Sequence, residues 1–142
     1  MVVNGVEGVY VAPDAGDLIP LVGSNFTAFF ENIGFNWRRL AGAHIIAING
    51  LPPYEYVDRI ATNTSGNYLD HGVRVNSVFS SYRLDGNNLF SQRFGDLAGP
   101  PFPDPESVTY TLIPVNSTKP ETVTVPYAAD FIGAAFTDGP SL

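Results

Sequence analysis

Few residues in this sequence combine a type and a spacing that could do chemistry. Asp70 and His71 are the clearest candidates, because they place an acid next to a base in a stretch flanked by glycine. Such a pair can move protons, but covalent hydrolysis also needs a positioned nucleophile, and none is evident beside it. A small hydrolase whose site forms only in the fold, with these two residues in it, is therefore the least favoured hypothesis for this chain.

The motifs of common catalytic and ligand sites are missing. The sequence has no G-x-S-x-G nucleophile elbow, no Ser-x-x-Lys pair, no H-E-x-x-H zinc motif and no phosphate-binding glycine loop. Its aspartates do not follow the calcium-loop spacing, and the absence of cysteine excludes thiolate metal ligands and disulfides. We therefore predict no catalytic residue, no metal and no cofactor. A glycosidase built on two carboxylates stays open, because such residues meet only in the fold, although so short a chain disfavours it.

The bulk composition indicates one globular domain. The 142 residues are 44% hydrophobic and 15% charged, which is typical of a chain that folds around a core. The net charge of −7 disfavours nucleic acid and anionic membranes as partners, since both would repel it. No apolar run is long enough to span a bilayer. The opening residues lack the basic and apolar regions of a signal peptide, and we expect the chain to be part of a longer protein.

Three N-x-[ST] sequons are potential acceptors for N-linked glycans, at Asn25, Asn63 and Asn116. The sequons at Asn63 and Asn116 lie in stretches that we expect to be surface loops, where a glycan is tolerated. The sequence is also free of cysteine, rich in aromatic residues, Asn, Ser and Thr, and poor in lysine. Together these features predict a secreted, extracellular glycoprotein. Three chance matches are the alternative, because the motif is short.

Residues 43–61 predict a buried strand, a tight turn and a helix, in that order. The run 45–48 is apolar and rich in β-branched residues, which favours a strand covered on both faces. Asn49-Gly50 tolerates the left-handed backbone that a sharp turn needs. A helix over 53–61 follows, because two prolines suit its first turn and apolar residues recur at helical spacing.

Hydrophobic periodicity and turn residues predict the remaining elements. The aromatic residues between Phe26 and Trp37 are expected to belong to the hydrophobic core, and 62–67 to be a polar loop. In chain order the predicted elements are a strand at 8–12, a short turn or helix from Asp17, a helix from Ser24 that ends at Gly34, an element of undecided type at 73–79, a turn at 85–88, a proline-rich connector at 99–105, and a hairpin of strands 107–113 and 122–127.

One stretch resembles a known family. Residues 40–50, Leu-Ala-Gly-Ala-His-Ile-Ile-Ala-Ile-Asn-Gly, resemble the A-G-x-x-I-x-x-I-N-G strand and turn of PDZ domains. In particular they look like the PDZ-like domain of the tail-specific, C-terminal-processing serine peptidases of the S41 group. The hairpin of 108–113 and 122–127 is similar to the closing strand pair of those domains. The stretch 35–42, Phe-Asn-Trp-Arg-Arg-Leu-Ala-Gly, also looks like secreted fungal members of the group.

The resemblance covers about 35–61 and 106–131 and implies a fold class. It implies an α+β, PDZ-like domain, a small and partly open β-barrel or sandwich with one or two helices. The single domain would span 1–133, with a long insert at about 62–105 and a tail or linker at 134–142. Two departures from the family are this insert and the lack of a carboxylate-binding loop of the Gly-Leu-Gly-Phe type.

The resemblance also implies a peptide groove between a strand edge and the helix at 53–61. Tyr54, Val57 and Asp58 are the residues that would line it on the helix. Val57 has an alternative place in the core, which is the default for an apolar residue at helical spacing.

The implied function is that of a non-catalytic domain of a secreted S41-type serine peptidase or peptidase-like protein. Its partner would be an extended polypeptide, bound by β-augmentation and presented to the catalytic domain of its own parent chain, or that catalytic domain itself. The family's catalytic serine and its base belong to that separate α/β domain, and no residue here matches them. The alternative is a free-standing secreted interaction or structural module in which the insert contacts a partner.

Overall fold

The computed structural model describes residues 1–22, 24–66, 68–98 and 106–127. The predicted proline-rich connector at 99–105 and the predicted tail at 134–142 lie outside these residues.

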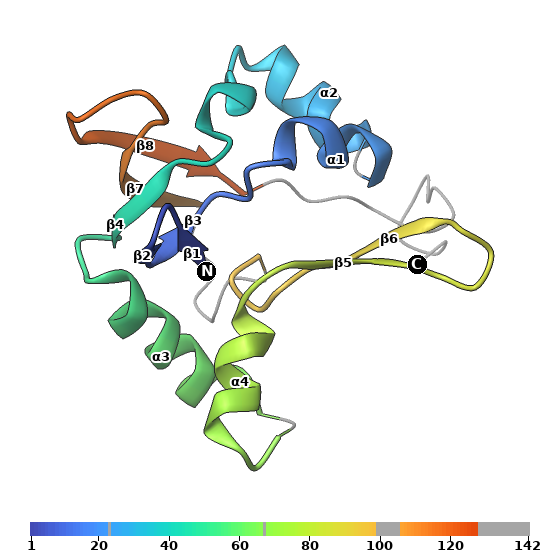
Figure 1. The fold of residues 1–142 in the computed structure, drawn as a ribbon, viewed down its shortest axis with the longest axis vertical. Coiled ribbons are helices and arrows are strands. Elements are labelled where there is room, and N and C mark those ends of the chain that lie inside the picture. Colours follow the sequence, from blue (N-terminus) through green and yellow to red (C-terminus); the bar gives the residue numbers. More distant parts are fainter. Residues whose placement is uncertain (23, 67, 99–105, 128–142) are drawn as a thin grey trace, which may run out of the picture.

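A four-stranded antiparallel sheet forms the centre of the described structure (Figure 1). Its order is β3 (Val9–Tyr10), β4 (His44–Ile48), β7 (Ser107–Ile113) and β8 (Glu121–Pro126). Strands and helices are mixed along the chain, so the prediction of a small α+β domain is confirmed. Within the described residues the strands form open sheets and do not close into a barrel.

The other elements lie around this sheet. Two short hairpins, β1–β2 and β5–β6, form separate two-stranded sheets. Figure 1 places α1 and α2 near one end of the central sheet and α3 and α4 near the other. The bounds are β1 Val2–Val3, β2 Val6–Glu7, α1 Ala15–Val22, α2 Ser24–Asn32, the 3-10 turn η1 Trp37–Leu40, α3 Pro53–Asn63, α4 His71–Val78, β5 Ser81–Leu84 and β6 Phe90–Arg93.

The predicted strand, turn and helix at 43–61 are confirmed, with one correction. Asn49 and Gly50 both have positive φ, at 48° and 78°, as the sharp turn requires. The strand, however, is not buried on both faces, because Ile46 is 36% exposed. The register of β4 against β7 shifts between Ile45 and Ala47, and a bulge of this kind turns the extra residue away from the regular pleat.

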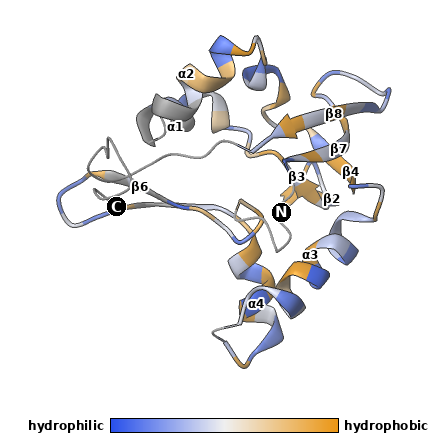
Figure 2. Ribbon diagram, turned by 180° about the vertical axis from the view of Figure 1, so that it is seen from behind, coloured by the Kyte–Doolittle hydropathy of each residue, from blue (hydrophilic) through white to orange (hydrophobic). Residues whose placement is uncertain are grey.

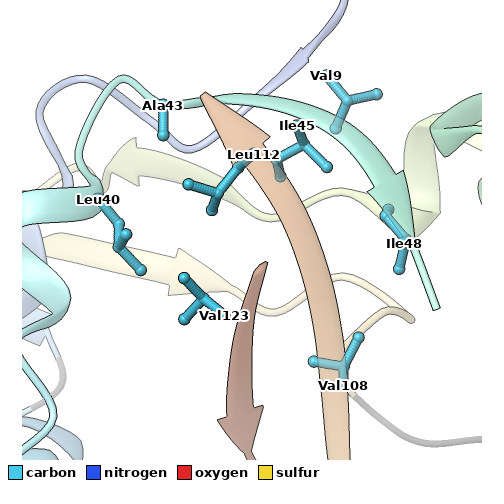
Figure 3. Packing of buried hydrophobic residues seen from close by; sticks show 8 residues of the cluster. All are labelled: Val9, Leu40, Ala43, Ile45, Ile48, Val108, Leu112 and Val123. Carbon is cyan, nitrogen blue, oxygen red and sulfur yellow. The ribbon is translucent and has the colours of Figure 1, made fainter. Parts of the chain in front are cut away.

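The core consists of two hydrophobic clusters. The sheet cluster contains Val9, Leu40, Ala43, Ile45, Ile48, Val108, Leu112 and Val123 (Figure 3). The helix cluster contains Val57, Ile60 and Ala61 from α3 with Val78 from α4. Tyr56 and Phe79 pack against both clusters and so connect them. Figure 2 shows the same division, with hydrophobic residues along the central strands and where α3 meets α4.

The aromatic stretch between Phe26 and Trp37 is only partly in the core. Helix α2 forms as predicted, and Gly34 follows it with a φ of 73°. Phe29 and Ile33 are nevertheless exposed, whereas Trp37 is buried. Figure 1 places α2 beyond one end of the central sheet.

The insert at about 62–105 contains regular structure in its described part. The element of undecided type is the helix α4, whose first turn is capped by Asp70 through a 2.9 Å bond from the Val73 amide. The predicted turn at 85–88 joins β5 to β6, and Asp85 Oδ1 accepts bonds from the Asn87 and Leu89 amides. Part of the predicted polar loop at 62–67 is helical, because α3 continues to Asn63.

Candidate polypeptide-binding site

The three predicted groove residues on α3 do not share a surface. Tyr54 and Asp58 are exposed, but Val57 is only 1% exposed and belongs to the helix cluster. Helix α4 of the insert packs against α3 and covers this side of it. The assignment of Val57 to a groove is therefore corrected, and the residue takes its alternative place in the core.

The predicted acid–base pair is not a pair in the structure. Asp70 caps α4, whereas His71 Nε2 lies 2.5 Å from Oδ1 of Asp58 on α3. Both members of the Asp58–His71 contact are more than half exposed, so its electrostatic contribution is screened by water. The contact bridges two helices and thereby helps to hold the insert on α3.

Asn49 connects the turn after β4 to two other elements. Its backbone N–H donates to the Thr109 carbonyl at 2.7 Å, and its side-chain Oδ1 accepts from the backbone N–H of Thr109 at 2.9 Å. Its Nδ2 donates to the Tyr56 hydroxyl at 3.2 Å. The turn therefore fixes α3 relative to β7.

Strand β8 is an edge of the sheet, because no described strand pairs with its outer side. The Tyr127 amide donates to the Glu106 carbonyl at 3.0 Å, so this pair exchanges the ladder bonds. Bonded and non-bonded pairs alternate along an antiparallel ladder. Val123 and Val125 therefore bond to β7, while Thr122 and Thr124 turn their N–H and C=O groups away from it.

The bond from Asn49 to Thr109 supports this parity independently. It shows that Thr109 of β7 directs its backbone toward β4, and Thr109 is the partner of Thr124 in the register. A residue that bonds β4 on one side leaves its partner on the other side without a ladder bond. The backbone N–H and C=O of Thr124 therefore have no partner among the described residues at this sheet edge.

Prolines limit the length of this edge. Pro120 and Pro126 flank the two threonines at positions two residues away, so their backbone also faces the outer side of the strand. Proline has no N–H to donate there. Thr122 and Thr124 are thus the residues of β8 that can offer both backbone groups to an added strand. Their side chains are exposed.

A polar pocket of about 180 Å³ lies between the segment that follows α3, helix α4, and the end of β6 with the residues after it. Ser65 and Ser77, both buried, line it with Arg93 and Asp96, and the Ser65 hydroxyl donates to Asp96 Oδ2. Its described lining contains no imidazole or amine that could activate a serine. The Ser65–Asp96 bond ties the segment after α3 to the segment after β6.

Three tyrosines meet where α3, β7 and the end of β8 come together. Burial raises the pKa of Tyr110 well above its ordinary value, and the phenols of Tyr127 and Tyr56 raise it further. Burial also raises the pKa of Tyr127, whose hydroxyl donates to the Leu97 carbonyl at 3.2 Å. Tyr110 and Tyr127 therefore stay neutral at physiological pH.

The asparagines of the sequons at Asn63 and Asn116 are on the surface. Asn63 is exposed at the last residue of α3, and Asn116 is exposed in the β7–β8 connection with a φ of 63°. The side chain of Asn25 is outside the described part. Ser65, the hydroxyl residue of the Asn63 sequon, is only 5% exposed.

Other classes of site find no support in the described part of the chain. Its histidines, aspartates and glutamates form no group of three or more that could hold a metal ion. None of its helices is both long and apolar enough to cross a membrane.

Comparisons with protein-family models, with curated proteins and with solved structures find no match for this chain.

Thr122 and Thr124 are not among the functional candidates expected from the sequence. A signal was present in the alternation of threonine and valine between two prolines, which is typical of an edge strand. The alternation alone does not tell which side of the strand is free.

Proposed function

We propose that this chain is a PDZ-like, non-catalytic domain of a secreted S41-type serine peptidase or peptidase-like protein. In this role it binds an extended polypeptide as an added β-strand and presents it to the catalytic domain of its parent chain. The observation that carries the proposal is the edge of β8 that no described strand pairs, with the outward backbone groups of Thr122 and Thr124.

The order of elements supports the PDZ-like part of the proposal. A strand, an Asn-Gly turn and a helix follow one another, and that strand pairs with the first strand of a closing hairpin. The binding site proposed for the added strand differs from the groove beside the helix at 53–61 that the resemblance implies. Because α4 covers the Val57 side of α3, we propose the outer edge of β8 as the position of the added strand.

A titration of the isotopically labelled chain with short unstructured peptides tests this function. We expect saturable shifts of the Thr122, Val123 and Thr124 amide signals. Thr124→Pro removes an outward N–H without removing a bond to β7, so it should weaken binding about tenfold or more, as the loss of a buried hydrogen bond does. Thr124→Val keeps the N–H and is the matched control.

A second measurement leaves the protein unchanged. Two series of peptides are compared, one methylated on the odd-numbered backbone nitrogens and one on the even-numbered ones. Only alternate amides of an added strand face β8, so one series should lose binding and the other should keep it. Equal binding by both series, or unchanged binding by a folded Thr124→Pro variant, would contradict strand addition at this edge.

A free-standing interaction module is the second candidate, and exposed apolar residues on the insert favour it. Leu69 is fully exposed, and Leu84 and Leu89 are also exposed. In the same titration with a partner protein, this candidate predicts shifts confined to 68–98. The mass of the native protein, measured with an antibody and a serine-reactive probe, then separates a domain of a larger peptidase from a module of about 15.3 kDa.

A further inference from the structure

A shallow depression of about 200 Å³ runs along one side of α3 and reaches the sequon Asn63-Thr64-Ser65. Its described lining comes from α3 and from Thr64, the residue directly after the helix. The positions are separated by three, four, seven and eight residues, so they share one helical face. They are Tyr56, Arg59, Ile60, Asn63 and Thr64.

The direction of the Asn63 side chain favours a group attached to it. Side chains of an α-helix lean toward the helix N-terminus and cover the preceding turn. From Asn63 the preceding turn carries Arg59 and Ile60, and Tyr56 follows one turn earlier. Because Asn63 is exposed, a substituent on Nδ2 has room to lie back over the depression.

We propose that the first sugars of an N-linked glycan on Asn63 pack into the depression along α3. The inference rests on the secretion proposed above, and it is independent of peptide binding. The C–H face of a sugar ring would cover the half-buried ring of Tyr56, which removes apolar surface from water. Its hydroxyl groups would accept bonds from Arg59.

The attachment is a group transfer from a lipid-diphosphate-linked oligosaccharide. A bond forms between Asn63 Nδ2 and the anomeric carbon, and the bond from that carbon to the diphosphate oxygen breaks. The lipid diphosphate leaves with the electron pair, and the amide nitrogen loses one proton to the transferase. No atom is oxidised or reduced.

The structure also fixes when the transfer can occur. The Ser65 hydroxyl of this sequon is buried and donates to Asp96 in the folded chain. The acceptor sequon must therefore be used before this corner folds. In the Asn116 sequon both Asn116 and Thr118 are exposed in the folded chain, so that sequon stays accessible.

The test begins with the chain secreted from a glycosylating host as wild type, Asn63→Gln and Asn116→Gln. Mass spectrometry of glycopeptides should find Asn63 occupied in the wild type. After an endoglycosidase has trimmed each glycan to a single N-acetylglucosamine, the wild type and Asn116→Gln should unfold about 3–5 °C above Asn63→Gln. Unglycosylated wild type and Asn63→Gln from bacteria control for the substitution itself and should unfold together.

This packing is observed directly by nuclear Overhauser contacts from the retained sugar to Tyr56 and Ile60. An unmodified Asn63 in the secreted chain would overturn the proposal. So would an occupied Asn63 whose sugar makes no contact with α3 and does not raise the unfolding temperature. The peptide titration uses unglycosylated protein, so the two proposals fail separately.

Discussion

At the scale of single residues, the pKa of Tyr110 reflects its buried surroundings. It lies on the core-facing side of β7 together with Val108 and Leu112, with Tyr127 and Tyr56 beside it. Burial disfavours the charged phenolate, which is why the pKa of Tyr110 is raised, and the neighbouring phenols act in the same direction. The unfolded chain has no such environment.

The raised pKa predicts a loss of stability at alkaline pH. An unfolded tyrosine loses its proton near pH 10, and folded Tyr110 loses it only at higher pH. Between these values the unfolded state binds fewer protons, so the free energy of unfolding falls as the pH rises past about 10, by up to about 1.4 kcal/mol per pH unit. Below about pH 9 no such change is expected.

Urea unfolding of wild type and Tyr110→Phe from about pH 8 to about pH 11.5 measures this effect. The variant should lose stability less steeply above pH 10. Tyr54→Phe, whose ring is exposed, is the control and should follow the wild type. Parallel curves for wild type and Tyr110→Phe would exclude Tyr110 as a source of the alkaline loss.

At the scale of elements, the β4 turn determines how α3 is attached. Asn49 adopts positive φ, accepts a bond from the Thr109 amide and donates to the Tyr56 hydroxyl. The first property belongs to the turn, the second ties it to β7 and the third ties it to α3.

Asn49 substitutions should separate these properties by their cost. Asn49→Ala forces alanine into an unfavourable positive φ and leaves the Thr109 amide without its acceptor. We therefore expect a loss of about 2–3 kcal/mol in the free energy of unfolding. Asn49→Gly relieves the φ and should cost about 1 kcal/mol less than alanine. Asn49→Asp keeps the acceptor for Thr109 and loses only the donor to Tyr56. Urea unfolding measures all three, and an alanine variant as stable as the glycine variant would contradict the role of φ.

At the scale of the whole molecule, the two hydrophobic clusters should unfold together. Tyr56 and Phe79 pack against both, and the Tyr127 hydroxyl bonds the end of the sheet to Leu97 in the insert. These contacts make the insert part of the same cooperative unit as the sheet.

Leu112→Ala in the sheet cluster and Ile60→Ala in the helix cluster test this cooperativity. Each should cost about 2–5 kcal/mol, because each removes buried methyl groups from a packed site. Fluorescence of the single tryptophan, Trp37, and far-ultraviolet circular dichroism should report the same midpoint in every variant. A lower midpoint by circular dichroism alone in Ile60→Ala would show that the insert unfolds separately.

Local features of this fold could be predicted from the sequence. The Asn49-Gly50 turn, the helix after Pro52 and the closing hairpin depend on residues within a few positions of one another. Backbone preferences and hydrophobic periodicity act over that distance, so they determine these elements before tertiary contacts form. The lack of cysteine and of common catalytic motifs likewise belongs to the sequence alone.

Only the tertiary structure decided which surfaces are free. The partner of His71 is Asp58, thirteen positions away, and not its neighbour Asp70. Val57 is covered because the insert returns to α3, and Ile46 is exposed because a bulge turns it outward. The side of β8 that no described strand covers follows from its pairing with β7. Each outcome depends on segments distant in sequence, whose relative positions are set by packing and strand register rather than by local preference.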